Sequence, residues 1–195
     1  MNDSYFRAPW QTLLIDRVAG LCALLKLKPH HLTILALILG MAALPALYWH
    51  YSWLAVFLLL ASGLLDAADG TLARKLGLSS DAGCILDILA DRSVEFAVVI
   101  GLYLYAPERG FLLLILLGSF YLCVTTFLLS GIFERNLSKK SFHYSPGLIE
   151  RAETFIYFPI VIIFEETFFW GTIIFATLVF FTAFKRFFEM LRAYS

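Results

Sequence analysis

The sequence has few charged residues, few cysteines and no stretch that reads as a signal peptide. Charged residues make up 15% of the 195 positions and hydrophobic residues 61%, whereas soluble domains carry about a quarter charged residues. Cys22, Cys84 and Cys123 are far apart and lack the spacing of a metal site, so we read them as packing residues. The first residues lack a basic start followed by an apolar run. This composition predicts an integral membrane protein.

Long apolar runs predict six membrane-spanning helices. A span needs about 20 mostly apolar residues, and the runs that qualify or nearly qualify cover residues 32–49, 53–66, 84–105, 111–133, 154–164 and 168–184. The fifth run has the shortest apolar core. We therefore expect an all-α membrane protein with one domain over residues 1–195, in which residues 32–188 form a six-helix bundle.

Residues 1–28 have the pattern of an amphipathic helix that precedes the first span. Apolar side chains recur at spacings of three and four, while Arg7, Asp16 and Arg17 fall elsewhere on the helical wheel. We expect this helix to lie in the membrane interface; the alternative is a soluble amphipathic helix packed on the bundle. The apolar positions are Trp10, Leu13, Leu14, Val18, Leu21 and Leu24.

The basic residues gather on one side of the predicted bundle. Of the 15 Lys and Arg residues, only Arg109 falls in a loop on the other side, and Arg92 lies inside the third span. Cytosolic loops carry the excess of Lys and Arg in membrane proteins. With six spans, this rule predicts that both termini are cytosolic.

Four aspartates flank the short cytosolic loop between the second and third predicted spans. Asp66 and Asp69 are three residues apart, and Asp87 and Asp91 four, so each pair shares one face of a helix. A carboxylate within a span costs roughly 2.5–3.5 kcal/mol on insertion scales, so a compensating charge is expected. Mg²⁺ or Mn²⁺ suits an all-oxygen site, and two pairs suggest two ions. Asp66 and Asp69 alone could equally be solvated carboxylates at a helix end.

Small residues and an arginine accompany the aspartates. Gly70 and Gly83 have no side chain, so helices and ligands can approach the backbone there. Arg74 is one turn beyond Gly70 on the same face, where its guanidinium could hold a phosphate bidentately. The pattern favours a phosphate-binding metal site.

The pattern resembles the signature of the CDP-alcohol phosphatidyltransferase family (class I), D-x2-D-G-x2-A-R-x8-G-x3-D-x3-D. The resemblance implies phospholipid biosynthesis, in which a phosphatidyl group passes from CDP-diacylglycerol to an acceptor alcohol and CMP is released. It implies that Asp66, Asp69, Asp87 and Asp91 bind two divalent ions and that Asp91 is also the general base. Every spacing is met by Asp66, Asp69, Gly70, Ala73, Arg74, Gly83, Asp87 and Asp91.

The same resemblance implies a set of substrate contacts. Gly70, Arg74 and Ser80 stand where the family holds the CDP group. The start of the first span resembles the family's Pro-x-x-x-Thr motif, which borders the cytidine. Its residues here are Pro29, His30, His31, Leu32 and Thr33.

The acceptor depends on basic residues on the cytosolic side. Arg135, Lys139 and Arg151 could hold the phosphate of glycerol 3-phosphate or inositol phosphate. Residues 147–154 resemble the Ile-Glu-Arg-Pro-Glu-Arg stretch of inositol-phosphate-using members, with Arg151 matching the first arginine. Thr154 replaces the second arginine, and Phe133 stands where those members carry a lysine. These two departures weaken the inositol-phosphate interpretation.

We therefore expect a phosphatidyltransferase for a phosphorylated polyol. A member using an unphosphorylated alcohol, such as inositol or serine, is the alternative, and a divalent-cation transporter is a remote one. The expected partners are CDP-diacylglycerol, a small polar acceptor, membrane lipids and, from the resemblance, a second copy of the chain; nucleic acid is not expected. The site would face the cytosol from the cell inner membrane or its equivalent.

Overall fold

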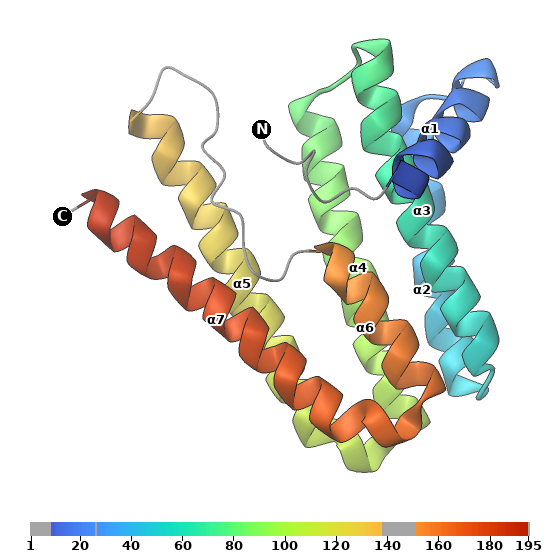
Figure 1. Ribbon diagram of the computed structural model, residues 1–195, viewed down its shortest axis with the longest axis vertical. Helices are drawn as coiled ribbons and strands as arrows, with labels where there is room; N and C mark the ends of the chain where they lie inside the picture. The colour runs from blue at the N-terminus through green and yellow to red at the C-terminus, as the bar shows by residue number, and fades with distance from the viewer. Residues whose placement is uncertain (1–8, 26, 138–150, 195) are drawn as a thin grey trace. The chain divides into compact units, whose positions relative to one another are not determined.

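The computed structural model describes residues 9–25, 27–137 and 151–194, and all the regular structure in these ranges is helical (Figure 1). Two short 3₁₀ helices accompany seven α-helices in the described chain. In order, the elements are α1 (Pro9–Leu24), α2 (Pro29–Tyr48), α3 (Ser52–Leu76), α4 (Asp81–Tyr105), η1 (Pro107–Arg109), α5 (Gly110–Leu137), α6 (Arg151–Ile163), η2 (Glu165–Thr167) and α7 (Phe168–Tyr194).

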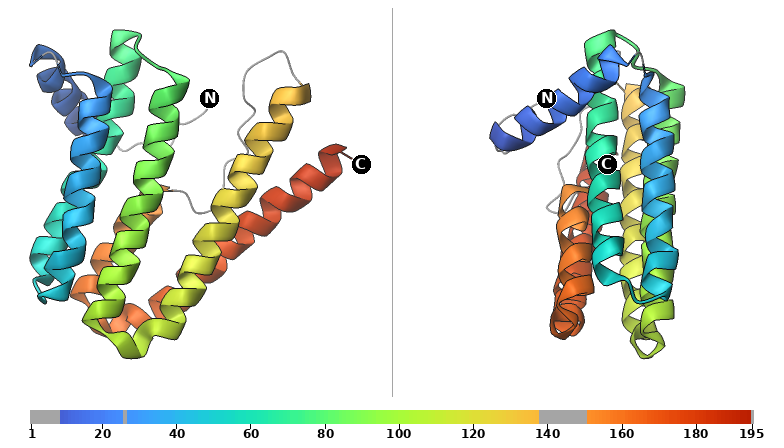
Figure 2. Two further views of the ribbon diagram at one scale, coloured as in Figure 1. Left: turned by 180° about the vertical axis from the view of Figure 1, so that it is seen from behind. Right: turned by 90° about the vertical axis from the view of Figure 1, so that its right-hand side faces the viewer.

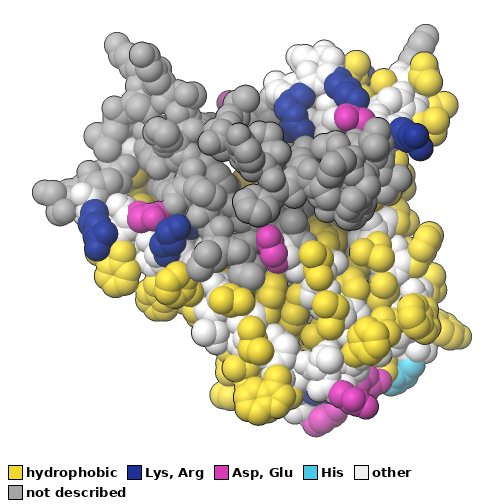
Figure 3. Space-filling view, viewed as in Figure 1, with side chains coloured by type: hydrophobic (Ala, Val, Ile, Leu, Met, Phe, Trp, Pro, Cys, Tyr) yellow, Lys and Arg dark blue, Asp and Glu magenta, His cyan; other side chains and the backbone are white. Residues whose placement is uncertain are grey.

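Four stretches of helix are long and apolar enough to cross a bilayer: Pro29–Tyr48, Ser52–Leu76, Pro107–Phe133 and Glu165–Arg192. Hydrophobic side chains cover much of the described surface (Figure 3), and Trp53 and Phe111 are 75% and 74% exposed. Contiguous apolar surface of this extent needs lipid around it. The chain is therefore an all-helical integral membrane protein, as predicted. The two other predicted spans coincide with α4, which carries several charges, and with α6, which has 13 residues.

Several helices extend beyond the predicted spans into polar sequence. The second span was expected to end at residue 66, but α3 continues to Leu76, so the whole first half of the signature is helical. Backbone hydrogen bonds do not require apolar side chains, and α3 stops only where Gly77 adopts a left-handed conformation with φ +65°. Likewise, α7 reaches Tyr194 instead of residue 184.

The chain divides into two compact units, Met1–Gly101 and Leu102–Ser195. In the first unit, α2 and α3 run antiparallel side by side, and α1 crosses them at an angle (Figures 1 and 2). Ser62 of α3 donates a hydrogen bond to the carbonyl of Ala36 in α2 at 2.7 Å. Within this unit α3 therefore packs against both α1 and α2.

One glycine on α2 and one on α4 let these two helices approach closely. A Cβ atom on Gly40 would lie 2.7 Å from Cγ1 of Val94 and 2.9 Å from the Ser62 hydroxyl, and closer still to the other Val94 methyl. At the other end of the contact, a Cβ on Gly101 would meet Leu47 at 2.8 Å. Such small-residue contacts are the usual basis of helix packing in membranes. They set the distance between α2 and α4, and α4 carries Asp87 and Asp91.

The predicted apolar stripe of α1 is divided between two environments. Ala19 and Cys22 are buried with Leu32, Ala68 and Leu72 in one cluster, against which Val18 packs. Leu21 and Leu24 are 62% and 82% exposed. Asp16 of α1 also pairs with Lys75 of α3 at 2.8 Å. One side of α1 thus packs on α3, and the packing role expected of cysteines holds for Cys22, whereas Cys84 is exposed.

In the second unit, the loops η1 and η2 are joined by an ionic cluster. Tyr105 donates a hydrogen bond to Glu165 at 2.5 Å, and Arg109 binds the other carboxylate oxygen at 3.1 Å. The Arg109 guanidinium also lies 4.8 Å from the centre of the Phe168 ring. The two loops that were predicted to share one side of the membrane therefore lie together at one end of this unit.

The core of the second unit is aromatic. Tyr157 of α6 stacks on Phe175 of α7 with ring centroids 4.2 Å apart, and its hydroxyl lies 2.7 Å from that of Thr172. Because Thr172 donates its own proton to the carbonyl of Phe168, Tyr157 is the donor of this pair. A hydroxyl buried in an apolar core is thus hydrogen-bonded, as burial requires.

Candidate active site

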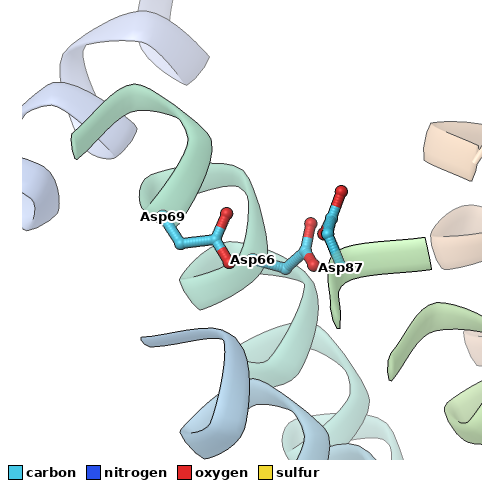
Figure 4. Close-up of side chains that lie close together, drawn as sticks. All are labelled: Asp66, Asp69 and Asp87. Carbon is cyan, nitrogen blue, oxygen red and sulfur yellow. The ribbon is translucent and has the colours of Figure 1, made fainter. Parts of the chain in front are cut away.

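Three of the four aspartates of the signature meet in the first unit. Asp66 and Asp69 project from α3 and Asp87 from α4, and their carboxylates converge (Figure 4). One oxygen from each lies within 4.8 Å of the others. Asp69 is 7% exposed, and Asp66 and Asp87 are partly buried. The spacing of three within one helix and the crossing of two helices together produce the cluster.

The cluster has the character of a cation site. Two carboxylates 4.8 Å apart repel by about 3 kcal/mol at an effective dielectric constant of about 20. Three such groups in a largely apolar helix pair therefore favour a positive ligand. Oxygen-only donor sets suit Mg²⁺ and Mn²⁺, and Mg²⁺ is commonly bound by one or two carboxylates together with substrate phosphates. The donor chemistry of Asp66, Asp69 and Asp87 thus fits a divalent ion that also contacts a phosphate.

Asp91 lies one turn beyond Asp87 on α4 and is not part of the group that meets within 4.8 Å. Its side chain is partly buried, and its Oδ1 atom is shielded from solvent. The four-residue spacing keeps it on the same face of α4 as Asp87. The structure therefore separates a group of three carboxylates from a fourth that lies beside it.

The start of α2 contacts the cluster through Thr33. The Thr33 hydroxyl donates a hydrogen bond to Oδ2 of Asp69 at 2.5 Å, and both residues are buried. Pro29 opens the helix, where its fixed φ is favourable and its missing N–H is not needed. Leu32 is buried in the hydrophobic cluster between α1 and α3, while His30 and His31 are exposed. Of the five residues predicted to contact substrate here, Leu32 and Thr33 are buried within the protein. The exposed His31 accepts a hydrogen bond from the backbone N–H of Lys28 through its Nδ1 atom, at 3.4 Å.

Arg74 is oriented by Thr71, a residue that the sequence analysis did not predict to be part of the site. Its Nη2 donates to the hydroxyl of Thr71 at 3.2 Å, and the Thr71 hydroxyl lies 3.1 Å from the carbonyl of Ala67. Thr71 occupies a variable position of the signature, so the motif itself gives no signal for it. The exposed guanidinium of Arg74 is therefore held along α3 beside Gly70.

Ser80 begins α4. Its hydroxyl accepts a hydrogen bond from the backbone N–H of Gly83 at 3.1 Å, which satisfies one of the free amides in the first turn. Gly77 and Ser80 thus bound the linker between α3 and α4, one as a helix stop and the other as a cap. This short linker keeps the two halves of the signature on adjacent helices.

An ion pair with a buried carboxylate follows Asp91 on α4. Arg92 contacts Glu95 at 2.6 Å, and Glu95 is 8% exposed. A buried carboxylate in an apolar helix is tolerated when a cation is paired with it. Glu95 stands one turn beyond Asp91 on α4.

The residues predicted to hold the acceptor are outside the part of the site that can be described. Lys139 falls in 138–150, beyond the described residues. Arg135 and Arg151 lie in α5 and α6, but their side chains are also outside the described part. Their roles stay predictions.

The family comparison covers the site and most of the fold. Residues 26–184 match the family described as CDP-alcohol phosphatidyltransferase, a range that takes in all four aspartates. The chain belongs to this family. It is therefore an enzyme of phospholipid synthesis with CDP-alcohol phosphatidyltransferase activity, and the transporter alternative is set aside.

Individual relatives differ in the activity their names record. The inner membrane protein YnjF of Escherichia coli is 36% identical over 170 residues, which are 82% of this chain and 81% of the relative. Archaetidylinositol phosphate synthase of Pyrococcus horikoshii is 32% identical over 107 residues, 54% and 57% of the two chains. CDP-diacylglycerol–serine O-phosphatidyltransferase of Mycobacterium leprae is 35% identical over 82 residues, 42% of this phosphatidyltransferase and 27% of the relative.

A solved structure has the same fold. Phosphatidylinositol phosphate synthase PgsA1 of Mycobacterium tuberculosis with CDP-DAG bound superposes with a TM-score of 0.72 at 21% identity, covering 89% of this enzyme and 91% of that chain. A second structure of PgsA1, in complex with manganese and citrate, gives a TM-score of 0.73, covering 89% of this enzyme and 87% of that chain. At this level of identity the comparison establishes the fold.

Proposed function

We propose that the enzyme transfers the phosphatidyl group of CDP-diacylglycerol to a phosphorylated polyol, such as glycerol 3-phosphate or inositol phosphate, and releases CMP. The observation that carries the proposal is the convergence of Asp66, Asp69 and Asp87 within 4.8 Å, with Arg74 two turns further along α3 from Asp66. Carboxylates for a divalent ion beside a guanidinium are the groups that a pyrophosphate needs. The bound CDP-diacylglycerol of the PgsA1 structure supports the same donor.

Two divalent ions, Mg²⁺ or Mn²⁺, would be held by Asp66, Asp69, Asp87 and Asp91. When bound, they would neutralise charge on the pyrophosphate and on the departing CMP. The manganese in the PgsA1 complex supports a divalent ion in this fold. Gly70, Arg74 and Ser80 would contact the CDP group, and the exposed His30 and His31 would border the cytidine together with Pro29.

Asp91 would act as general base. It would take the proton from the acceptor hydroxyl, whose oxygen forms a bond to the phosphorus that carries the diacylglycerol. The bond from that phosphorus to the CMP oxygen breaks, and CMP leaves with the electron pair. A base needs to be within hydrogen-bond reach of the proton, and the position of Asp91 beside the group of three supports this role.

A phosphorylated acceptor would be held by Arg135, Lys139 and Arg151. Two relatives support this choice, because the Pyrococcus enzyme is an archaetidylinositol phosphate synthase and PgsA1 is a phosphatidylinositol phosphate synthase. The serine-using relative keeps an unphosphorylated acceptor as the second candidate. Thr154 and Phe133, which depart from the inositol-phosphate pattern, favour a different phosphorylated polyol such as glycerol 3-phosphate.

The proposed setting is a single six-span domain in the cell inner membrane. α4 and α6 would complete the six spans, with α1 at the interface, both termini in the cytosol and the aspartates facing the cytosol. The excess of basic loop residues on one side and the name of the E. coli relative support this arrangement. A homodimer is proposed from the family resemblance.

A CMP-release assay tests the proposal. Purified enzyme with CDP-diacylglycerol and Mn²⁺ should release CMP with glycerol 3-phosphate or inositol phosphate, and not with inositol, serine or glycerol. Asp91→Asn should lose turnover by several orders of magnitude while still binding CDP-diacylglycerol, and chelation should stop the wild-type reaction. CMP release with serine alone would transfer the assignment to the second candidate, and metal-independent turnover would exclude the carboxylate site.

A further inference from the structure

The hydroxyl of Thr33 contacts a carboxylate of the cluster from a different helix. Thr33 lies in the second turn of α2, 36 residues before Asp69, and its Oγ1 is 2.5 Å from Oδ2 of Asp69. Thr33 is 4% exposed and Asp69 7%. The contact therefore joins two buried groups, and solvent does not compete for either of them.

A helical threonine often satisfies its hydroxyl within its own helix. The carbonyl of Pro29, four residues earlier, lies 3.2 Å from the Thr33 hydroxyl and could serve this purpose. A threonine has a single hydroxyl proton, and the carboxylate is the shorter contact. Hydrogen bonds to ionised acceptors are shorter and stronger than those between neutral groups. The proton therefore goes to Asp69.

A carboxylate has about four lone-pair positions, so the Thr33 bond leaves coordination capacity on Asp69. Hydrogen bonds of this kind fix the orientation of metal-binding carboxylates, and loss of such a partner typically lowers metal affinity or activity about 10–100-fold. The neighbouring Leu32 is anchored in the cluster of α1 and α3. The buried Leu32 side chain thus holds the start of α2 against α1 and α3.

We propose that Thr33 is a positioning residue that sets the orientation of the Asp69 carboxylate for the divalent ion. This differs from the substrate contact implied by the family resemblance. The proposal rests on the proposed function only in taking Asp69 as a metal ligand. It predicts that Thr33 governs the affinity for metal and leaves the affinity for the CDP-lipid at saturating metal unchanged.

The test measures Mn²⁺ affinity without turnover, by the electron paramagnetic resonance signal of free Mn²⁺ titrated against purified enzyme. Thr33→Val keeps the branched shape and removes the hydroxyl, and should weaken Mn²⁺ binding about 10–100-fold. Thr33→Ser restores the hydroxyl and should bind within a few-fold of wild type. Thr125→Val is the matched control, since that hydroxyl bonds the carbonyl four residues earlier in α5 at 2.7 Å.

Steady-state kinetics separate the two roles of Thr33. In Thr33→Val the metal concentration for half-maximal CMP release should rise, with KM for CDP-diacylglycerol unchanged at saturating Mn²⁺. Unchanged Mn²⁺ affinity with a raised KM would overturn the proposal and make Thr33 a substrate contact. Should the valine variant aggregate, Thr33→Ala takes its place. Thr33→Ala lacks the hydroxyl and should bind Mn²⁺ weakly, whereas Thr33→Ser keeps the hydroxyl and should bind Mn²⁺ nearly as wild type does. Wild-type enzyme that binds Mn²⁺ but releases no CMP would refute the proposed function and leave the Thr33 assignment standing.

Discussion

Gly40 offers a direct test of how closely the helices of the first unit pack. An alanine Cβ at this position would lie 2.7 Å from Cγ1 of Val94 and 2.9 Å from Oγ of Ser62, with the second Val94 methyl closer than either. A contact under 3.0 Å forces a neighbour to move. Because both methyls of Val94 face the position, rotation about χ1 exchanges one clash for another, and a helical valine has one strongly preferred rotamer. The backbone of α4 would have to shift.

The expected magnitude follows from overpacking. Extra methylene or methyl groups in a tight core cost about 1–3 kcal/mol. Glycine-to-alanine replacement in a helix also gains up to about 1 kcal/mol of intrinsic propensity, so the matched reference is Gly118→Ala, where no atom lies within 4 Å of the new Cβ. The difference between the two variants isolates the clash. For a chain of this size it corresponds to about 2–12 °C in the unfolding midpoint.

The assay is the midpoint of thermal aggregation in mild detergent, followed by size-exclusion chromatography of heated samples. Gly40→Ala should aggregate at a lower temperature than both wild type and Gly118→Ala. Adding Val94→Ala removes both clashing methyls, so the double variant should recover stability relative to Gly40→Ala, with a coupling of about 0.5–3 kcal/mol. Equal midpoints for Gly40→Ala and Gly118→Ala, or no coupling with Val94→Ala, would refute the packing argument.

Two further predictions concern the site and its orientation. A Cβ on Gly70 would meet only the Arg74 side chain, at 3.5 Å, so Gly70→Ala should keep the thermal midpoint of wild type yet lose about tenfold or more in kcat/KM for CDP-diacylglycerol; wild-type kinetics would show that no ligand approaches this backbone. Cys84 is exposed and Cys22 buried, so a membrane-impermeant maleimide should label Cys84 in inside-out vesicles and not in right-side-out vesicles, with Cys84→Ser as the control. Labelling only from the opposite face would reverse the proposed orientation.

Much of the site could be predicted because it is local in sequence. The spacing of Asp66 and Asp69 within one helix, and the short linker to α4, were enough to place their carboxylates near Asp87. The position of Arg74 beside Gly70 follows from the same helical period. Local spacing could not show that Asp91 lies apart from the other three carboxylates. Its distance from them depends on how α4 packs against α3.

Contacts between distant segments were beyond sequence reasoning. The hydrogen bond from Thr33 to Asp69 joins positions 36 residues apart, and nothing in either segment specifies the partner. The length of α3 was underestimated because the apolar run ends at residue 66, whereas the helix is limited by Gly77. The stripe on α1 was read as one face because helical periodicity does not show that a neighbouring helix covers only part of it.

The contact between α1 and α3 changes what the variable positions of the signature mean. Ala68 and Leu72 are both 0% exposed and lie beneath α1, between aspartates, glycine and arginine that face the site. One face of these two turns of α3 therefore carries the residues of the site, and the opposite face packs against α1. A larger residue at position 68 would displace α1 from α3 without touching a single motif residue. The packing of α1, a helix outside the signature, thus limits which substitutions the variable positions of the signature tolerate.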